Sequence, residues 1–228
     1  MLTNVSTAFL YYSFDSSTVS GSTVQNLGTG GSAYDATMVS SPTISTTDVV
    51  VGTGSIQFSA GSSQYVTIPS FSTGSSGLSF AFWFKFNSGG NGARIFDIGN
   101  GALSDNLFLS LYLNDCFLDS IHGASDNGKP LSCNLNVNDG LWRHLVWVIQ
   151  TSGDWAVYVN GALTNYYTGI PYPNTVTRSQ NYLGRSDWGS PSPDPYLNGA
   201  IDEFYMFQYA ITPTAVGALY QKGEVLSA

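Results

Sequence analysis

The amino-acid sequence predicts an all-β protein, a sandwich of two antiparallel sheets with one short helix near the C-terminus. The 228 residues are rich in Gly, Ser, Thr, Tyr and Phe and contain only three lysines, a composition typical of short strands joined by tight turns. Short apolar runs with a period of two recur between these turns, as half-buried strands require. Hydrophobic residues make up 43% of the chain and charged residues 10%, which provides a core and argues against disorder.

Strands are expected where apolar alternation is bounded by Gly, Asn, Asp or Pro. Residues 78–86 should lie in the middle of a sheet, because large apolar side chains fill one face and the other face is also partly apolar. Residues 16–41 are expected to form a long loop with a short strand near 36–39, and residues 54–58 and 65–69 a hairpin. Further strands are expected at residues 8–14, 94–98, 107–113, 117–121, 141–149, 155–159, 182–184 and 200–207.

The sequence pattern of residues 212–223 predicts the short helix. Thr212 suits the N-cap, Pro213 the first helical position and Gly223 the C-terminal cap. Apolar residues at i, i+3 and i+4 spacing form one stripe that can pack against the sandwich. No internal repeat or linker divides the sequence, so we expect a single domain over residues 1–228.

The charge pattern excludes several classes of partner. A formal net charge of -8 repels phosphate backbones and anionic lipid surfaces, and no Lys/Arg cluster overcomes it locally, so nucleic acid is not expected to bind. No apolar run approaches the roughly 20 residues that span a bilayer, and residues 1–10 lack the basic start and long apolar core of a signal peptide. We expect no membrane insertion, and either a fragment whose signal has been removed or a protein exported or packaged by another route, such as within a virion.

Cys116 and Cys133 are separated by a segment that contains the turn sequence Asp-Asn-Gly at residues 126–128, so a hairpin could bring them together. A disulfide would contribute about 3 kcal/mol in the chain-entropy model if the compartment is oxidising. The alternative is two free core thiols, since cysteine is among the most buried residue types. The sequence leaves both open.

Two adjacent acids, Asp202 and Glu203, stand near the start of the expected strand at 200–207. Neighbouring strand residues point to opposite faces, so one of the two should have a cation, an arginine or backbone N–H groups as partner. Asp15 and Asp35 lie in Gly/Ser-rich loops. There they either bind a cation or, as is commoner for acids in such loops, form Asx-turns with the local backbone.

A proline-rich loop over residues 187–196 is the candidate ligand site. Its prolines stiffen a segment that displays Trp188 and Tyr196, on whose rings a sugar could stack. The alternative is that Trp188 folds back as a lid on the core, since large aromatic residues are usually well buried. We take Trp188, Tyr196, Asp187 and Asn181 as the candidate ligand contacts.

A set of segments spread over the chain keeps the order of a known family. They are residues 54–58 with 65–69, 78–85, 139–145, 158–161, 183–185, 199–203 and 210–216. Together they resemble the laminin G-like family of concanavalin A-like lectin/glucanase jelly rolls, which occurs in lectins, adhesion modules and viral surface proteins. The resemblance covers nearly the whole chain and implies a jelly-roll topology for the sandwich, without specifying one function.

Many members of that family hold a structural calcium near the paired terminal strands. By resemblance, this implicates Asp202 as a ligand, with Asp15, Asp35 or Glu203 as further ligands, and calcium is the one expected cofactor. Calcium takes roughly six to eight oxygen ligands, several of which can be backbone carbonyls.

Some relatives of this fold are glucanases, which would show a Glu-x-Asp-x-x-Glu strand. Here Asp202 and Glu203 are followed by Phe-Tyr-Met-Phe, with no third acid. Because retaining glycosidases need two carboxyl groups about 5 Å apart, a glycoside hydrolase is not expected and no catalytic residue is assigned.

The sequence therefore favours a non-enzymatic recognition module that binds a glycan or a surface protein, outside the cell or on a virion surface. The alternative is a structural or decoration protein of a virion or extracellular assembly, in contact with other capsid or assembly subunits. A start at Met1 without a signal peptide and the scarcity of lysine fit that alternative.

Overall fold

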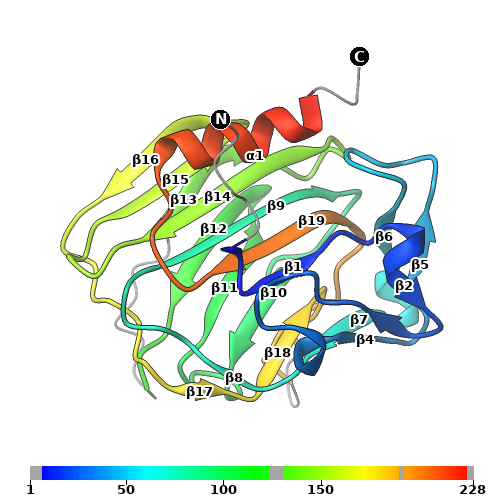
Figure 1. Ribbon diagram of the computed structural model, residues 1–228, viewed down its shortest axis with the longest axis horizontal. Coiled ribbons are helices and arrows are strands. Elements are labelled where there is room, and N and C mark those ends of the chain that lie inside the picture. The colour runs from blue at the N-terminus through cyan, green and yellow to red at the C-terminus, as the bar shows by residue number, and fades with distance from the viewer. Residues whose placement is uncertain (1–6, 124–130, 190–192, 225–228) are drawn as a thin grey trace.

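The computed structural model describes residues 7–123, 131–189 and 193–224. Two large antiparallel sheets pack face to face, and one C-terminal helix lies against the outside of one of them (Figure 1). The predicted all-β sandwich with a short helix is therefore confirmed.

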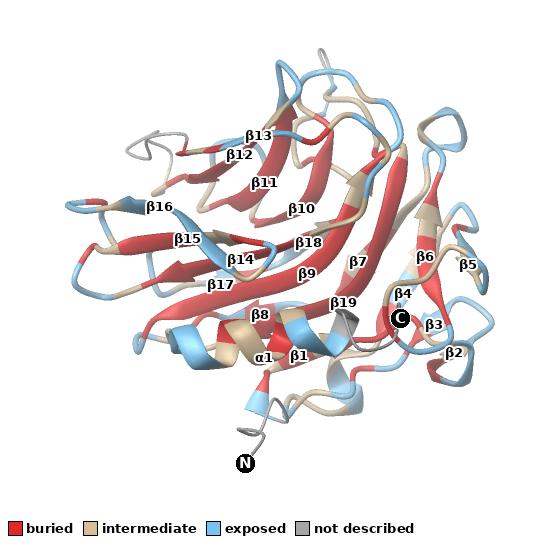
Figure 2. Cartoon of the chain, turned by 90° about the horizontal axis from the view of Figure 1, so that it is seen from above, coloured by how far each residue is buried: buried red, intermediate tan, exposed pale blue. Residues whose placement is uncertain are grey.

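The sheet that carries the helix has the strand order β16-β15-β14-β9-β19-β6-β5, and β1 also pairs with β19. Strands β9 and β19 lie in its middle and are buried along almost their whole length (Figure 2), as the two-faced apolar pattern of residues 78–86 predicts. The strands of this first sheet are β1 (Leu10–Tyr12), β5 (Thr43–Ser45), β6 (Ser55–Phe58), β9 (Leu78–Phe86), β14 (Arg143–Ile149), β15 (Trp155–Val159), β16 (Ala162–Tyr167) and β19 (Gly199–Phe207).

The second sheet has the order β13-β12-β11-β10-β18-β7-β4-β3-β2, and β8 pairs with β17 in a separate two-stranded ribbon. Its strands are β2 (Val19–Ser20), β3 (Thr23–Val24), β4 (Ala36–Val39), β7 (Tyr65–Ile68), β10 (Arg94–Gly99), β11 (Leu107–Tyr112), β12 (Asp115–Ser120), β13 (Leu131–Asn136) and β18 (Gln180–Leu183). The ribbon consists of β8 (Phe71–Ser72) and β17 (Thr177–Arg178).

Strands β6 and β7, which the sequence predicts to pair as a hairpin, belong to different sheets. Strand β6 pairs with β5 and β19, whereas β7 pairs with β4 and β18. A 3-10 turn at Ala60–Ser62 lies in the connection between them. Both runs alternate because each buries one face in the same core, so alternation does not identify the partner strand. The expected loop over residues 16–41 also contains β2 and β3.

Two apolar layers stabilise the sandwich. The main core fills the space between the sheets and contains many aromatic rings, among them Phe82, Phe96 and Phe204, whose centroids lie 5.7 to 5.9 Å apart. The second layer lies between the first sheet and α1 (Pro213–Glu224), where Val216 packs against the sheet. The predicted amphipathic helix thus covers one outer face, and the outer face of the second sheet has no helix on it within the described residues.

Glu203 occupies a β-bulge of β19. The pairing of β19 with β9 shifts register between Asp202 and Tyr205, and Glu203 has a positive φ of 54°. Asp202 lies opposite Trp83, whose ring stacks on Tyr220 of α1, and Glu203 contacts the last turns of the same helix. The prediction that the two acids face opposite sides is therefore wrong, because the extra residue of a bulge interrupts strand alternation.

Candidate ligand-binding site

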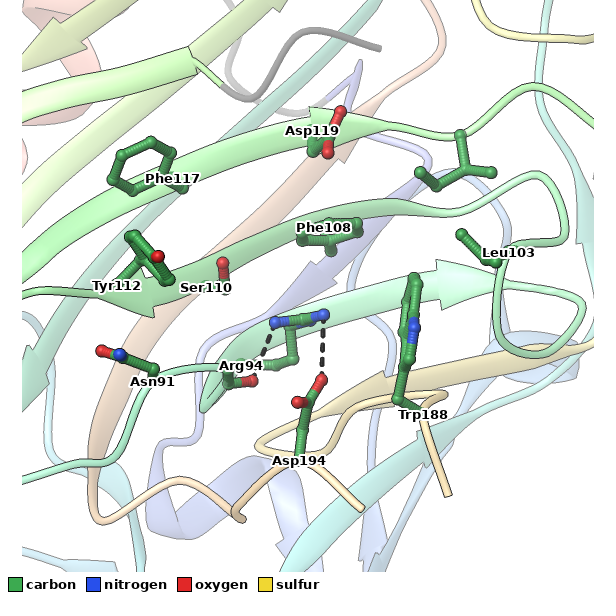
Figure 3. A pocket seen from close by; sticks show the side chains of 12 residues that line it. Asn91, Arg94, Leu103, Phe108, Ser110, Tyr112, Phe117, Asp119, Trp188 and Asp194 are labelled. Atoms are coloured by element: carbon green, nitrogen blue, oxygen red, sulfur yellow. Dashed lines mark hydrogen bonds and ion pairs between the residues drawn. The ribbon is translucent and has the colours of Figure 1, made fainter. Parts of the chain in front are cut away.

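A pocket of about 610 Å³ opens on the outer face of the second sheet, on the opposite side of the sandwich from α1. Strands β10, β11 and β12 form its floor, and the segments that follow β9 and β18 contribute to its walls (Figure 3). The lining residues are Asn91, Gly92, Arg94, Leu103, Phe108, Ser110, Tyr112, Phe117, Asp119, Ile121, Trp188 and Asp194.

Strand alternation places the floor residues. Every second residue of β11 is a leucine in the core, so Phe108, Ser110 and Tyr112 point outward into the pocket. In β12, Phe117 and Asp119 also face outward, and the rings of Tyr112 and Phe117 meet edge to face at 5.4 Å. None of these floor residues is among the candidate contacts expected from the sequence; the signal that could have found them is the aromatic side chains at alternate positions of two neighbouring strands.

Arg94 is the charged centre of the pocket, although only 5% of it is exposed. Its guanidinium carbon lies 4.1 Å from the ring centroid of Phe108 and 5.1 Å from that of Trp188. It also forms ion pairs with Asp194 at 3.1 Å (Figure 3) and with Asp97 at 3.4 Å. A planar guanidinium can stack on aromatic faces and bind carboxylates through its N–H groups at the same time. Arg94 therefore fixes Trp188 and Asp194 to the sheet, and its own charge is already paired.

Trp188 forms one wall of the pocket and is not part of the core. Its ring meets that of Phe108 edge to face at 5.6 Å, and its side chain remains partly exposed. The backbone N–H of Trp188 donates to the hydroxyl of Ser186 at 3.0 Å, and that hydroxyl donates to Asp194 at 2.8 Å. These bonds fix the backbone of Trp188, and its contacts with Phe108 and Arg94 orient the indole ring that lines the pocket.

Asp187 and Asp97 form an acid pair next to this wall. Nδ2 of Asn106 donates to both, to Oδ1 of Asp97 at 3.0 Å and to Oδ2 of Asp187 at 2.8 Å. The backbone N–H of Asp187 also donates to Oδ2 of Asp97 at 3.0 Å. Burial raises the pKa of Asp97, and burial together with the charge of Asp97 raises the pKa of Asp187 to about 8. Neither acid lines the pocket, so the pair supports the loop that carries Trp188.

The other two candidate contacts lie outside the pocket. Tyr196 packs against Tyr65 with 6.0 Å between ring centroids. Asn181 is buried, and its amide donates to the backbone carbonyls of Pro69 at 3.2 Å and Arg178 at 3.0 Å. The expected ligand contact of Asn181 is therefore corrected: its amide donors are engaged by backbone carbonyls, as buried polar groups generally are.

Asp202, one of the expected calcium ligands, is fully buried. Its Oδ2 accepts the backbone N–H groups of Val50 at 2.9 Å and Val51 at 3.0 Å, while its Oδ1 has no hydrogen-bond partner among the described residues. Burial above all raises the pKa of Asp202 to about 7, and the charge of Asp15 is one of the smaller contributions. Asp15 itself accepts hydrogen bonds from Thr53 of the same 50–53 segment. A buried, unpartnered carboxylate oxygen with a second carboxylate nearby fits part of a calcium ligand set.

Glu203 and Asp35 do not belong to that arrangement. Glu203 accepts from Nζ of Lys222 at 2.5 Å and from the hydroxyls of Tyr11, at 2.9 Å, and Tyr205. Asp35 accepts a backbone N–H of its own loop at 2.8 Å, the local bonding that acids in Gly/Ser-rich loops favour. Across the described ranges, the four expected metal ligands do not form one cluster, so the inclusion of Glu203 and Asp35 is corrected.

Cys116 and Cys133 are joined in a disulfide between β12 and β13, with their Cα atoms 5.4 Å apart. Both are buried in the main core. The turn sequence at residues 126–128 lies outside the described residues. The disulfide ties the strand that carries Phe117 and Asp119 to the edge of the second sheet.

Residues 60–217, more than half of the chain, match the model of a family described as the concanavalin A-like lectin/glucanases superfamily. The chain belongs to this superfamily. It is 27% identical over 151 residues to the sushi, von Willebrand factor type A, EGF and pentraxin domain-containing protein 1 of Rattus norvegicus, a match that covers 62% of this chain and 4% of the relative. The chain therefore spans a small part of that protein's length.

Solved structures share the fold. Domain 4 of AbnA, a GH43 extracellular arabinanase from Geobacillus stearothermophilus solved in complex with arabinotriose, has a TM-score of 0.71 at 23% identity, with 94% of this chain and 98% of that chain covered. A structure from a study of how botulinum neurotoxin type C depends on two ganglioside molecules for cell entry has a TM-score of 0.67 at 13% identity, covering 95% of this chain and 51% of that chain. Within the described residues, no helix is long and apolar enough to cross a membrane.

Proposed function

We propose that the chain is a non-enzymatic carbohydrate-recognition module whose glycan ligand stacks on Trp188 in the pocket of the second sheet. The observation that supports this most is the open, aromatic-lined pocket whose Trp188 is braced by Arg94 and Ser186. Binding sites of this kind combine apolar and aromatic walls with a few fixed polar groups. An aromatic ring held in advance binds at a lower entropic cost than a mobile one.

The comparisons support the same class of ligand. The AbnA domain resembles this chain over nearly its full length and was solved with arabinotriose. For this chain, an uncharged sugar ring over Trp188, with its hydroxyl groups toward Ser110 and Asp119, is the binding mode that the lining residues favour. Location outside the cell is part of the proposal, since the disulfide of Cys116 suits an oxidising compartment.

The acid pair beside the pocket does not support hydrolysis. A glycosidase needs two carboxyl groups that reach the glycosidic bond from the active-site surface. Asp97 is fully buried, and neither Asp97 nor Asp187 lines the pocket. Both acids are engaged by Asn106, so we assign the pair a structural role and propose no catalytic residue.

A glycan array followed by calorimetric titration of the best saccharide tests this function. Trp188→Ala should weaken binding by roughly tenfold or more, as expected for loss of an aromatic contact of about 1.5 kcal/mol. Trp188→Phe should retain part of the affinity. Tyr166→Ala is the matched control, because Tyr166 is an exposed aromatic residue on edge strand β16 of the other sheet. Full affinity in Trp188→Ala, or no binding to any saccharide, would refute the proposal.

We also propose a structural calcium held in part by Asp202 and Asp15. The unpartnered Oδ1 of Asp202 supports it. Calcium at a hundredfold excess over its Kd would stabilise the fold by about 2.7 kcal/mol. Thermal melts with a chelator and with added calcium should therefore differ by roughly 5 to 10 °C. Asp202→Asn should abolish this difference and Asp35→Asn should preserve it; an equal midpoint in both conditions removes calcium from the account.

A further inference from the structure

A second group of aromatic residues lies on the same sheet face as the pocket. Arg185 lies over the rings of Tyr65 of β7 and Tyr182 of β18, and Tyr196 packs against Tyr65. All four side chains are partly exposed. The guanidinium carbon of Arg185 lies 4.5 Å from the ring centroid of Tyr182 and 4.9 Å from that of Tyr65. Tyr65 contacts Tyr182 at 5.7 Å and Tyr196 at 6.0 Å. We call these four residues the tyrosine–arginine cluster.

Arg185 differs from the other cationic side chains that the structure describes. No hydrogen bond or ion pair joins Arg185 to any described residue; its guanidinium contacts the tyrosine rings, and Asp187, an acid on which its charge acts, is not in ion-pair contact with it. The other cations are occupied: Lys85, Arg94, Arg143 and Lys222 form ion pairs, and Arg178 is buried with neutral oxygen acceptors. In a chain with a net charge of -8, an arginine without a carboxylate in ion-pair contact is a site where an anion can bind.

The geometry of the tyrosine–arginine cluster suits an oxyanion. A guanidinium that rests on aromatic faces is oriented and partly desolvated, while its N–H groups remain available. Those N–H groups match the two oxygens of a carboxylate or sulfate, and such charge-assisted bonds are stronger than neutral ones. Tyrosine hydroxyls are further hydrogen-bond donors that an oxyanion can use.

Strand register connects this cluster to the pocket. Phe108 lies opposite Asp97 across β11 and β10, and Asp97 lies opposite Tyr182 across β10 and β18. Directly opposed residues share a face of the sheet, so Tyr182 lies two strand spacings, about 10 Å, from Phe108. An oligosaccharide with one ring at Trp188 can therefore extend across the sheet toward Tyr182 and Arg185.

We propose that the tyrosine–arginine cluster is an anion subsite that selects saccharides with a carboxylate or sulfate group beyond the ring held at Trp188. This rests on the proposed glycan-binding function. The pocket itself disfavours an anion, because Arg94 is already paired with Asp97 and Asp194 and Asp119 borders the same space. The two sites thus bind different parts of the ligand: the pocket binds an uncharged sugar ring, and Arg185 binds the carboxylate or sulfate group.

Three forms of one oligosaccharide test this subsite by calorimetry at low and high salt: a glucuronate-terminated form, its carboxyl-reduced neutral counterpart and a sulfated counterpart. The unmodified protein should bind an acidic form roughly tenfold tighter than the neutral one, and salt should reduce that preference. Comparison of the carboxylate and sulfate forms identifies the preferred anion. Arg185→Gln should abolish the preference and leave affinity for the neutral form unchanged, whereas Arg143→Gln, on the other sheet, should change neither.

The outcomes separate the two proposals. Equal affinity for all three forms, or a preference that survives in Arg185→Gln, overturns the anion subsite and leaves glycan binding intact. No binding of any form overturns the glycan function. In that case, an NMR titration of the arginine Nε–H signals with methyl glucuronide and with sodium sulfate still decides about Arg185: a saturable shift of its signal supports the subsite, and an unchanged signal refutes it.

Discussion

Replacement of Asp187 by Asn should stabilise the protein at about pH 9 and have little effect at about pH 4. Asp187 and Asp97 both accept hydrogen bonds from Nδ2 of Asn106, at 2.8 Å and 3.0 Å, so these carboxylate oxygens lie within about 6 Å of each other. At that separation and an effective dielectric constant of about 20, two negative charges repel each other by about 3 kcal/mol. The repulsion acts only when both acids are ionised.

The sign of the effect follows from the raised pKa. Burial and the charge of Asp97 raise the pKa of Asp187 to about 8, so the folded protein keeps a proton that the unfolded chain has released. The stability linked to this proton is fully present below the unfolded pKa, near 4, and is lost as the pH rises through about 8. The asparagine side chain would keep an acceptor for Asn106 without the charge. The difference in unfolding free energy between variant and unmodified protein should therefore grow by about 3 kcal/mol from acid to alkaline pH.

Urea unfolding at several pH values between about 5 and 9 measures this difference. Asp139→Asn is the control, because a hydrogen bond from Arg143 lowers the pKa of Asp139 to about 2. Stability from a lowered pKa is present above the unfolded pKa and is lost as the pH falls through about 2, so this control should show no alkaline effect. A difference for Asp187→Asn that stays constant from pH 5 to 9 would refute the raised pKa of Asp187.

Three further predictions concern stability. Lys222→Met should cost about 3 kcal/mol in urea unfolding, because it leaves the buried carboxylate of Glu203 without its cation; the double variant with Glu203→Gln should recover most of that loss, and no recovery would argue against the ion pair. Reduction of the disulfide, or Cys116→Ser, should lower the unfolding free energy by about 3 kcal/mol, and equal melting with and without reductant would contradict this. Gly199→Ala should lower the unfolding free energy by about 3 kcal/mol, because a Cβ at this position would collide with the backbone carbonyl of Lys85. A variant of unchanged stability would contradict this, since it would mean that β19 and β9 can move apart to make room for the methyl group.

The features that the sequence predicts well are those that periodicity determines. The strand at 78–86 is apolar on both faces and lies in the middle of a sheet, and the apolar stripe of residues 212–223 packs as a helix against that sheet. Both depend on side-chain spacing within one segment. The proline-rich pattern of residues 187–196 also identified Trp188 as a candidate contact, and Trp188 lines the pocket.

The features that the sequence analysis missed depend on partners distant along the chain. The assignment of β6 and β7 to different sheets, and the bulge that turns Glu203 toward Lys222, have no local signal. Arg94 would have remained an ordinary strand residue in any sequence analysis, because its two aromatic contacts come from other segments. Asn181 appeared to be an available polar residue, and only the fold shows that it is buried.

NMR mapping of a bound saccharide tests the central claim, that the outer face of the second sheet recognises glycans, most directly. Titration of isotope-labelled protein with the best saccharide from the array should shift the indole N–H of Trp188 and the amides of Phe108 and Asp119 saturably, with the signals of α1 unchanged. Saturable shifts confined to α1 or to the first sheet would contradict the account.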